Sequence, residues 1–343
     1  MATGTRRIGF QPPAVGDDEI AAVAETIRSG WLTTGPRAAE LEERMQAYLE
    51  AEHVLAVASG TAAMHLALVA LGIGPGDEVI TTPITWPATA NVVVHTGATP
   101  VFVDVRPDDL NVDPELAAAV VTPNTKAILP VDLAGQPCDL DPLLALGLPV
   151  IEDAAHATES RYRGRKVGSI ADAIRDLRLM RRGDGSLYDI TVPGYKANLS
   201  DVLAAIALVQ LDKVDAHAEI RARQFAIYDE GLADVDGITP LGRDARDLHA
   251  RHLYIVRVDA ERYGLSRDEL QRALDEEGVS TSIHFLPVHR LTWYRERFPE
   301  QPPLPVAERA GAEILSLPLS PAHPDDDIAA VVDAIHRVRD RAA

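Results

Sequence analysis

The sequence has very little cysteine, which excludes two kinds of structural support. Cys138 is the only cysteine among 343 residues. An intrachain disulfide and a cysteine-based metal cluster are therefore excluded, and we predict no metal site. We interpret Cys138 as a small buried side chain, in keeping with a reducing cytoplasm.

Long apolar runs are also missing. The first residues, MATGTRRIGFQPPAVGDDE, lack the apolar core of a secretion signal. No stretch approaches the roughly 20 apolar residues that a membrane span needs. We expect a soluble, cytoplasmic protein.

Positive charge is scarce as well. The chain has 33 basic and 52 acidic residues and a net charge of −19. Nucleic acids and anionic membranes require clustered Lys and Arg, so we exclude both as partners. A small anionic ligand stays possible, because a local pocket can oppose the overall field. Aromatic residues make up 5% and apolar residues 46%, so the core must be mainly aliphatic.

The first two thirds of the chain alternate between strand and helix patterns. Two amphipathic helices are predicted over Asp17–Ser29 and Ala38–Glu50. Strands are then predicted over residues 54–59, 76–82, 99–105, 125–133 and 148–155, with helices over 61–72, 87–97, 114–121 and 141–146. Strands separated by such helices indicate an α/β fold with right-handed crossovers and a mostly parallel sheet.

The last third has a different pattern. A long helix over Ser200–Leu232 precedes a strand over 252–259, a helix over Ser266–Glu277, a strand over 279–285 and a helix over Asp325–Arg339. This order is typical of an α+β domain. We predict a large α/β domain over residues 1–235 and a small α+β domain over residues 236–343.

Three segments at strand ends suggest a ligand site. Ser59-Gly60-Thr61 lies where a buried strand meets a helix, and free N–H groups at a helix start favour a phosphate. Taken alone, this segment is better explained by an ordinary helix cap, which Thr61 is able to supply. Trp86 follows the next strand, where an aromatic ring can cover a flat ligand or simply join the core.

Asp153 ends a fully apolar strand, at the edge where open α/β sheets bind ligands. A carboxylate there can pair with a pyridinium nitrogen and keep it protonated, or it can merely cap the strand. His156 follows three residues later and can reach a ring hydroxyl, although a loop histidine is the simpler interpretation. Together with the phosphate loop and the aromatic ring, these residues describe a pyridoxal phosphate (PLP) site.

The motifs follow one another as in a known family. In order they are SGWLTTGP, SGTAAMHLAL, GDEVITTPITWPATAN, GATPVFVDV, AGQPCDLD, IEDAAHA, RGRKVGS, PGYKANLSD, HLYIVRVD, SIHFLPVH and LSLPLSP. The chain resembles DegT/StrS-family sugar aminotransferases nearly end to end. It most resembles enzymes that make UDP-4-amino-4-deoxy-arabinose. The resemblance implies PLP fold type I, with a large PLP-binding domain.

The resemblance also implies roles for individual residues. Ser59, Gly60, Thr61 and Ala62 would bind the cofactor phosphate, Trp86 would stack on the ring, Asp153 would pair with its nitrogen, and His156 would lie by its hydroxyl. Asn198 would reach the phosphate of the partner subunit in a homodimer. Thr34, Lys196, His284 and Tyr294 would contact the sugar nucleotide. L-Glutamate would supply the amino group, and a keto group on a UDP- or dTDP-linked sugar would receive it.

One expected element is missing. The family carries its Schiff-base lysine in a segment resembling Ser-Phe-x-x-x-Lys-Asn, between two strands, but here VGSIADA runs directly into IRDLRLMRR. The catalytic lysine is therefore absent between Ala173 and Ile174, and a second shortening falls between Arg181 and Asp184. Loss of two strands would orphan buried backbone groups at about 1–3 kcal/mol each. We favour the explanation that the gene encodes residues that are missing from this sequence. Consecutive Cα atoms about 3.8 Å apart at both points would instead support a true deletion.

The chain has four lysines, and none stands in the expected segment. They are Lys126, Lys166, Lys196 and Lys213. Lys196 belongs to the family's own PGYK motif, and we do not expect it to substitute. Two alternatives remain open: an inactive homologue that binds PLP or a sugar nucleotide in a regulatory or structural role, and a lysine-independent PLP dehydratase that uses a histidine.

Overall fold

The computed structural model describes residues 7–167, 181–182, 190–192 and 195–342. The predicted breaks at Ala173–Ile174 and Arg181–Asp184 involve residues outside these ranges, so their Cα spacing is not described.

The helices are α1 (Asp17–Ser29), α2 (Pro36–Leu49), α3 (Gly60–Ala70), α4 (Ala88–His95), α5 (Pro114–Ala119), α6 (Leu140–Leu144), α8 (Asp201–Leu232), α9 (Ala260–Tyr263), α10 (Arg267–Glu276), α11 (Thr292–Arg297), α12 (Pro305–Glu313) and α13 (Asp325–Ala342), with short 3-10 turns at Leu133–Gly135 and Val288–Arg290.

In the part of the chain that the structure describes, the strands form four small sheets. They are β1 (Glu78–Thr81), β2 (Thr99–Phe102), β3 (Thr125–Leu129), β4 (Arg161–Tyr162), β5 (Arg165–Lys166), β6 (Arg181–Arg182), β7 (Ile190–Val192), β8 (Ile238–Pro240), β9 (Tyr254–Val258) and β10 (Ile314–Leu317). The pairs β4–β5 and β6–β7 are antiparallel hairpins.

The central sheet of the large domain is parallel, as predicted. Its order is β2-β1-β3, and β1 pairs in parallel with both neighbours. Parallel bridges Ile128↔Val150 and Val131↔Asp153 place residues 150–153 beside β3 as a fourth extended segment. The α/β prediction with a parallel large-domain sheet is confirmed.

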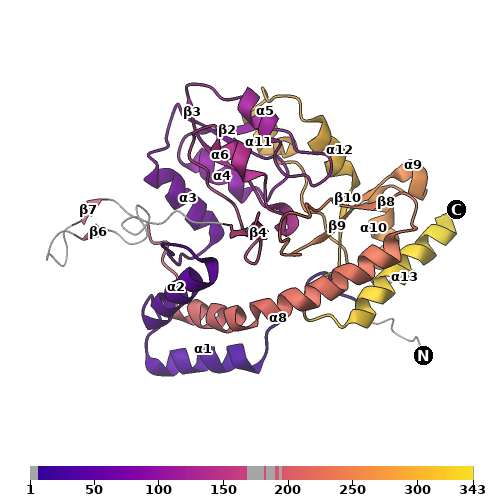
Figure 1. The fold of residues 1–343 in the computed structure, drawn as a ribbon, viewed down its shortest axis with the longest axis horizontal. Coiled ribbons are helices and arrows are strands. Elements are labelled where there is room, and N and C mark those ends of the chain that lie inside the picture. Colours follow the sequence, from indigo (N-terminus) through magenta and orange to yellow (C-terminus); the bar gives the residue numbers. More distant parts are fainter. Residues whose placement is uncertain (1–6, 168–180, 183–189, 193–194, 343) are drawn as a thin grey trace.

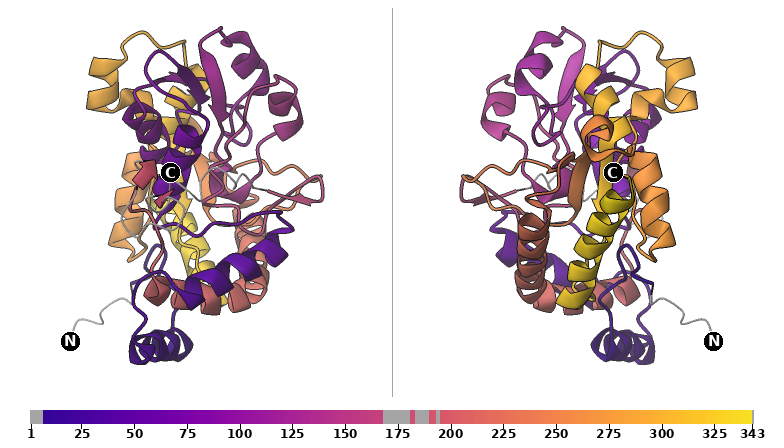
Figure 2. Two further views of the ribbon diagram at one scale, coloured as in Figure 1. Left: turned by 90° about the vertical axis from the view of Figure 1, so that its left-hand side faces the viewer. Right: turned by 90° about the vertical axis from the view of Figure 1, so that its right-hand side faces the viewer.

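The long helix α8 connects the two ends of the molecule. Ser200 caps it by accepting a hydrogen bond from the Leu203 N–H, which satisfies one of the free donors of the first turn. Its first half packs on α1 and α2, and its second half lies along α13 (Figure 1). The two side views show α1 at the bottom of the molecule and α13 rising from there to the C-terminus (Figure 2).

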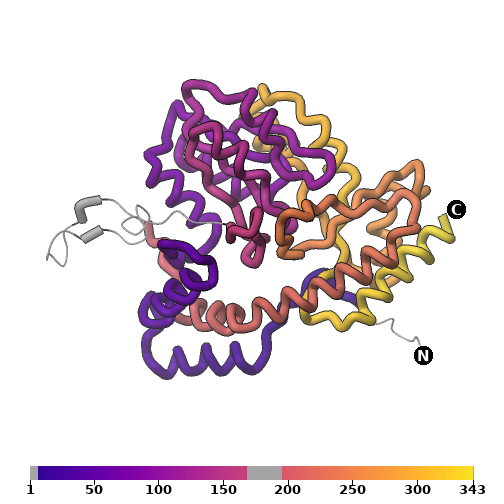
Figure 3. The backbone as a smooth tube through the Cα atoms, in the orientation of Figure 1, coloured from indigo at the N-terminus to yellow at the C-terminus, as the bar shows by residue number. Residues whose placement is uncertain are grey.

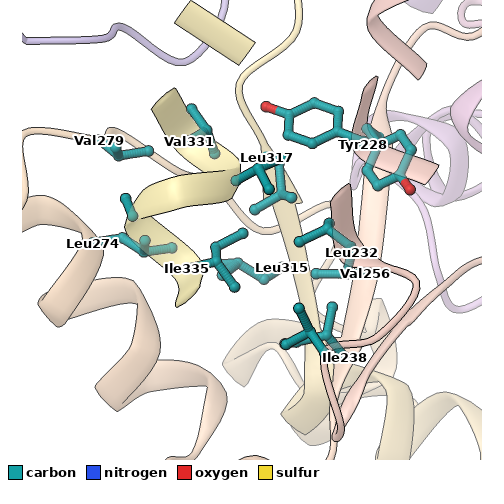
Figure 4. Close-up of a cluster of buried hydrophobic side chains, with 14 of the residues drawn as sticks. Tyr228, Leu232, Ile238, Val256, Leu274, Val279, Leu315, Leu317, Val331 and Ile335 are labelled. Carbon is teal, nitrogen blue, oxygen red and sulfur yellow. The ribbon is translucent and has the colours of Figure 1, made fainter. Parts of the chain in front are cut away.

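The C-terminal part has its own antiparallel sheet and core. The strand order is β10-β9-β8. Leu274, Leu315 and Ile335 are fully buried between this sheet and the helices (Figure 4). Burial of each such side chain contributes about 1.5–3 kcal/mol. The α+β pattern of the last third is thus observed, whereas the domain boundary near residue 235 stays a prediction.

Three predicted strands are reduced to isolated bridges. Residues 54–59 form only the bridge Val57↔Asn198, and residues 148–155 only the two bridges to the β3 segment. Residues 279–285 pair through Ile8↔Val279 and Ser282↔Ser316. In the first segment Leu55 and Val57 are only half-buried, because no described strand lies alongside them. Among the described residues, no helix combines the length and apolarity needed to cross a membrane.

Candidate functional site

The carboxyl edge of the parallel sheet gathers the predicted ring-binding residues. Asp153 ends the fourth extended segment, and the Thr89 hydroxyl donates a 2.8 Å hydrogen bond to its Oδ2 atom. The Ala155 N–H donates to Oδ1 at 3.3 Å. Burial raises the pKa of Asp153, while these two donors oppose that shift. A positively charged group bound next to Asp153 would further favour its ionised carboxylate.

Trp86 lies at the same edge and presents its ring to solvent. Its exposed fraction is 64%, so it does not belong to the core. Its ring centroid is 6.1 Å from that of Phe285, at a tilt of 59°. Phe285 follows a cis peptide bond after His284. An exposed aromatic face at a ligand-binding edge is suited to cover a flat ring.

His156 lies nearly parallel to two other rings. Its ring centroid is 4.4 Å from that of His252 and 6.0 Å from that of Phe285, with interplanar angles of 19° in both cases. Its Nδ1 atom accepts a hydrogen bond from the Ala134 N–H at 3.3 Å. Burial lowers the pKa of His156 to about 4. The side chain is therefore neutral near pH 7.

The predicted phosphate loop opens helix α3. Ser59, Gly60 and Thr61 are all exposed, and Ala62 is half-buried. Ser59 is the N-cap, because its side chain accepts a 3.1 Å hydrogen bond from the Ala62 N–H. The prediction that Thr61 supplies the cap is wrong, since Thr61 is already inside the first turn. The free N–H groups of this first turn can bind an anion.

Asn198 lies next to this loop. It forms an antiparallel bridge with Val57, and the Ala58 N–H donates to the Ala197 carbonyl at 2.7 Å. The Asn198 side-chain amide donates to the Thr34 hydroxyl, which donates to the Leu199 carbonyl at 2.5 Å. The Asn198 Oδ1 atom is buried without a hydrogen-bond partner. Thr34 and Asn198 thus meet, as two polar residues that the sequence separates widely.

The remaining substrate candidates have different surroundings. Lys196 is exposed. The Nδ1 atom of His284 lies 2.9 Å from the Ser316 hydroxyl. The His284 ring contacts the Phe285 ring edge-on, with the two ring centroids 4.9 Å apart. Tyr294 is buried, and its hydroxyl donates to the Asn91 Oδ1 atom at 2.6 Å. Burial raises the pKa of Tyr294 to about 12, and the Asn91 contact already uses its donor.

A large apolar cavity separates the phosphate loop segment from the fourth extended segment. It has a volume of about 670 Å³. Leu55 and Val57 line one wall, and Val150 and Ile151 line the other. Val167 also contributes to the lining. In extended backbone, alternate residues direct their N–H and C=O groups to opposite edges. Because residues 149, 151 and 153 bond to the β3 segment, the backbone groups of Val150 point toward this cavity.

Three of the four lysines are held away from the ring-binding residues. Lys126 donates to the Pro123 carbonyl at 3.0 Å, Lys166 lies 3.8 Å above the Tyr48 ring, and Lys213 is paired with Asp18 and Glu19. In the described part of the chain, no cluster of three or more His, Cys, Asp or Glu side chains is arranged to hold a metal ion.

Sequence reasoning missed three residues of this site. Thr89 is a helix residue that gave no sign of contacting Asp153, although its spacing of three from Trp86 puts both near one helix end. His252 and Phe285 come from distant parts of the chain, and the HLYIVRVD and SIHFLPVH motifs contain them. These motifs indicated that the two segments are characteristic of the family, but they did not predict that His252 and Phe285 contact His156.

Comparison with known proteins identifies the chain's relatives. The sequence model of the DegT/DnrJ/EryC1/StrS aminotransferase family matches residues 13–175 and 172–336. Spr1654 of Streptococcus pneumoniae, described as a sugar aminotransferase and solved in its PMP form, is 31% identical with a TM-score of 0.92, over 98% of this chain and 100% of that chain. DesV of S. venezuelae is 33% identical with a TM-score of 0.89, over 98% and 99%.

DesI, solved with its TDP-sugar product, is 31% identical with a TM-score of 0.89, over 98% of this chain and 94% of that chain. These matches have the PLP fold type I seen here, with a parallel sheet in the large domain and an antiparallel sheet in the C-terminal part. The chain belongs to the DegT/DnrJ/EryC1/StrS aminotransferase family.

Proposed function

We propose that this protein uses PLP to transfer an amino group from L-glutamate to a keto group of a UDP- or dTDP-linked sugar in the cytoplasm. The observation that carries the proposal is the half-buried Asp153 carboxylate, held by Thr89 at the ligand-binding edge of the sheet. Its charged form is disfavoured by burial, and a protonated ring nitrogen is a cation that would offset this cost.

Most of the site fits this cofactor. Asp153 would hold the ring nitrogen, Trp86 would cover the ring, and the exposed start of α3 at Ser59–Ala62 would hold the phosphate. Bound PLP supplies an electron sink for proton movement at the substrate carbon. Three of the four lysines are engaged elsewhere, and Lys196 is exposed. The lysine amine that family members use is therefore the one part of the site that does not fit.

The chain's own residues would then orient and shield the reacting groups. Asp153 would keep a proton on the ring nitrogen, and Trp86 would exclude water from one ring face. His156, neutral at pH 7, would donate a hydrogen bond to the ring hydroxyl. Thr34, Lys196, His284 and Tyr294 are our candidates for the walls of the sugar-nucleotide site, with Tyr294 acting through packing because its hydroxyl binds Asn91.

The apolar surface around α1 supports a homodimer. Several large apolar side chains there are more than half exposed: Ile20, Ile27, Trp31, Leu32 and Leu203. They come from α1, the turn after it and the start of α8, which lie together at one end of the molecule (Figure 3). Clustered exposed apolar groups of this kind mark association surfaces. In such a dimer Asn198 would contact the phosphate bound by the partner subunit.

The relatives support a nucleotide-linked sugar as the acceptor. DesI was solved with a TDP-sugar product, and Spr1654 is described as a sugar aminotransferase. Within this class, the motif resemblance leads us to propose a UDP-linked 4-keto sugar of the arabinose type as the first acceptor to test.

Two observations support a lysine-bearing segment that this sequence lacks. The family model matches in two pieces that meet at residues 172–175, where the sequence predicts the interruption. The cavity between Leu55 and Val150 lies between two extended segments, where additional strands would complete the sheet. Neighbouring strands in a sheet lie about 4.8 Å apart, so additional strands could occupy this cavity.

The absence of a suitable lysine favours a second candidate function. An inactive homologue would still bind PLP or a sugar nucleotide through Asp153, Trp86 and the start of α3. Such a protein would have a regulatory or structural role. It would show no Schiff-base chemistry with PLP.

An absorbance experiment tests both candidates. The gene-encoded protein, the 343-residue chain and its Lys196→Ala variant are each mixed with PLP and then treated with borohydride. We expect a reducible band from the gene-encoded protein and none from either 343-residue chain. A band that Lys196→Ala removes would assign the amine to Lys196. Absence of a band from every protein, with PLP still bound, would favour the inactive homologue.

A further inference from the structure

The backbone around His156 selects one form of its ring. The Ala134 N–H donates to Nδ1, so Nδ1 must carry the lone pair. A neutral imidazole has its single proton on the other nitrogen. His156 therefore carries its proton on Nε2, and no described residue accepts a hydrogen bond from that atom. A proton on Nδ1 would instead face the Ala134 N–H.

Ala134 has this orientation because of an unusual turn. Its backbone is left-handed, with φ 58° and ψ 3°, a conformation that costs a non-glycine residue about 1–2 kcal/mol. The next residue, Gly135, has φ 98°, and a Cβ atom there would lie 2.9 Å from the His156 carbonyl oxygen. The turn can thus approach His156 only with glycine at position 135.

The segment that contains His252 holds this turn in place. The His252 N–H donates to the Ala134 carbonyl at 2.9 Å, and the Ala250 N–H donates to the Gly135 carbonyl at 3.0 Å. His252 consequently acts on His156 in two ways: its ring stacks on the His156 ring, and its N–H holds Ala134, which bonds to Nδ1. The stack fixes the plane of the His156 ring, and the Ala134 N–H fixes its tautomer.

We propose that His252 is a positioning residue, which holds His156 as the Nε2–H tautomer so that this side chain donates a hydrogen bond to the anionic hydroxyl of the cofactor ring. The proposal rests on the proposed function for the identity of the acceptor. The tautomer itself is a property of the chain without cofactor. A hydrogen bond to an ionised acceptor is stronger than one between neutral groups, so correct aim should matter for cofactor affinity.

The charged surroundings support a neutral pair. Besides burial, the nearby Arg221, His249 and His284 side chains all disfavour a positive charge on His252 and lower its pKa. Burial is the main reason that the pKa of His252 is lowered to about 3, and the nearby His156 adds to the effect. Both rings are thus uncharged over the ordinary pH range, which allows them to stack closely.

Nitrogen-15 NMR of the histidine side chains tests the tautomer in the 343-residue chain without cofactor. We expect His156 to show a protonated Nε2. His252→Phe keeps an aromatic ring and its backbone N–H, and we expect the same tautomer. His252→Ala keeps the backbone N–H but removes the stack that fixes the ring plane of His156. We therefore expect Nδ1 to lose its alignment with the Ala134 N–H and the two tautomers to mix. His336→Ala is the control, because that ring contacts Gly231 on α8 instead.

A protonated Nδ1 on His156 in the unaltered chain would overturn the proposal, as would an unchanged tautomer in His252→Ala. A binding assay with PLP adds a second readout. We expect His252→Ala to weaken PLP binding about tenfold and His252→Phe to weaken it less than threefold. Failure of every variant and of the unaltered chain to bind PLP would refute the proposed function, while the NMR result would still decide the role of His252.

Discussion

The Thr89 hydroxyl donates a 2.8 Å hydrogen bond to the Asp153 carboxylate. This contact links the start of α4 to the end of the fourth extended segment, so that the acid is aimed before any ligand arrives. Thr89 in turn lies 2.7 Å from the Thr85 hydroxyl. The donor is thus itself oriented by a neighbour, which makes Asp153 the best-supported side chain of the site.

Replacement of Thr89 by Val should weaken cofactor binding. The variant removes a donor to the carboxylate and further raises the pKa of Asp153, because the Thr89 contact opposes the effect of burial. One such hydrogen bond is worth about 0.5–1.5 kcal/mol, so we expect the dissociation constant for PLP to rise about 2- to 12-fold. Trp fluorescence quenching measures it. Thr96→Val is the matched control, since the Thr96 hydroxyl donates to the Val93 carbonyl, and equal effects of the two changes would contradict the assignment.

Replacement of Asp153 by Asn should stabilise the cofactor-free chain and impair its function. Burial raises the pKa of Asp153 in the folded chain, so the folded chain holds this proton more tightly than the unfolded chain does. Ionisation therefore costs stability once the pH exceeds the unfolded value of about 3.9. We expect a higher melting temperature than the unaltered chain at pH 7 and no difference below about pH 3.5.

The same variant should lose the partner of the ring nitrogen. In the gene-encoded protein we expect turnover to fall about 100-fold or more, as it does when a preorganised electrostatic contact is removed. A lower melting temperature at pH 7, or unaltered turnover, would show that Asp153 is instead a structural cap.

Acid should destabilise the fold through His249. This side chain is buried, and burial is the main cause that lowers its pKa to about 3, with Arg243 and Arg251 adding to the effect. The unfolded chain binds the proton more readily, so stability is lost as the pH falls from about 6.5 toward 3. Each pH unit within that window costs about 1.4 kcal/mol from this group. Urea unfolding at several pH values measures the slope, and His249→Asn should reduce it. An identical slope in the variant would contradict this assignment.

The cavity wall should tolerate truncation better than the core. Leu55 is half-buried and faces the cavity, whereas Leu68 on α3 is fully buried. We expect Leu55→Ala to cost less than about 1.5 kcal/mol and Leu68→Ala about 2–5 kcal/mol in the 343-residue chain. Urea unfolding compares them. Equal costs would show that the cavity wall is as tightly packed as the core. That result would contradict the proposal that additional strands occupy the cavity.

Local patterns predicted most of the elements and the order of the site residues. The apolar spacing over Asp17–Ser29 gave α1 at its exact ends, and the βα alternation gave the parallel sheet, because helix and strand periods are properties of neighbouring residues. The apolar strand ending in Asp153 placed an acid at the ligand-binding edge for the same reason. The sequence also revealed that the expected lysine segment is missing.

Only the tertiary structure decided what surrounds those residues. His252 and Phe285 reach His156 from beyond α8, and no local pattern encodes a contact between residues so far apart in the chain. The predicted strand over residues 54–59 is apolar enough to be buried, yet it lines a cavity, because burial depends on which segments lie alongside. Sequence determined which chemical groups stand at the strand ends, and the packing of distant segments determined how they are aimed.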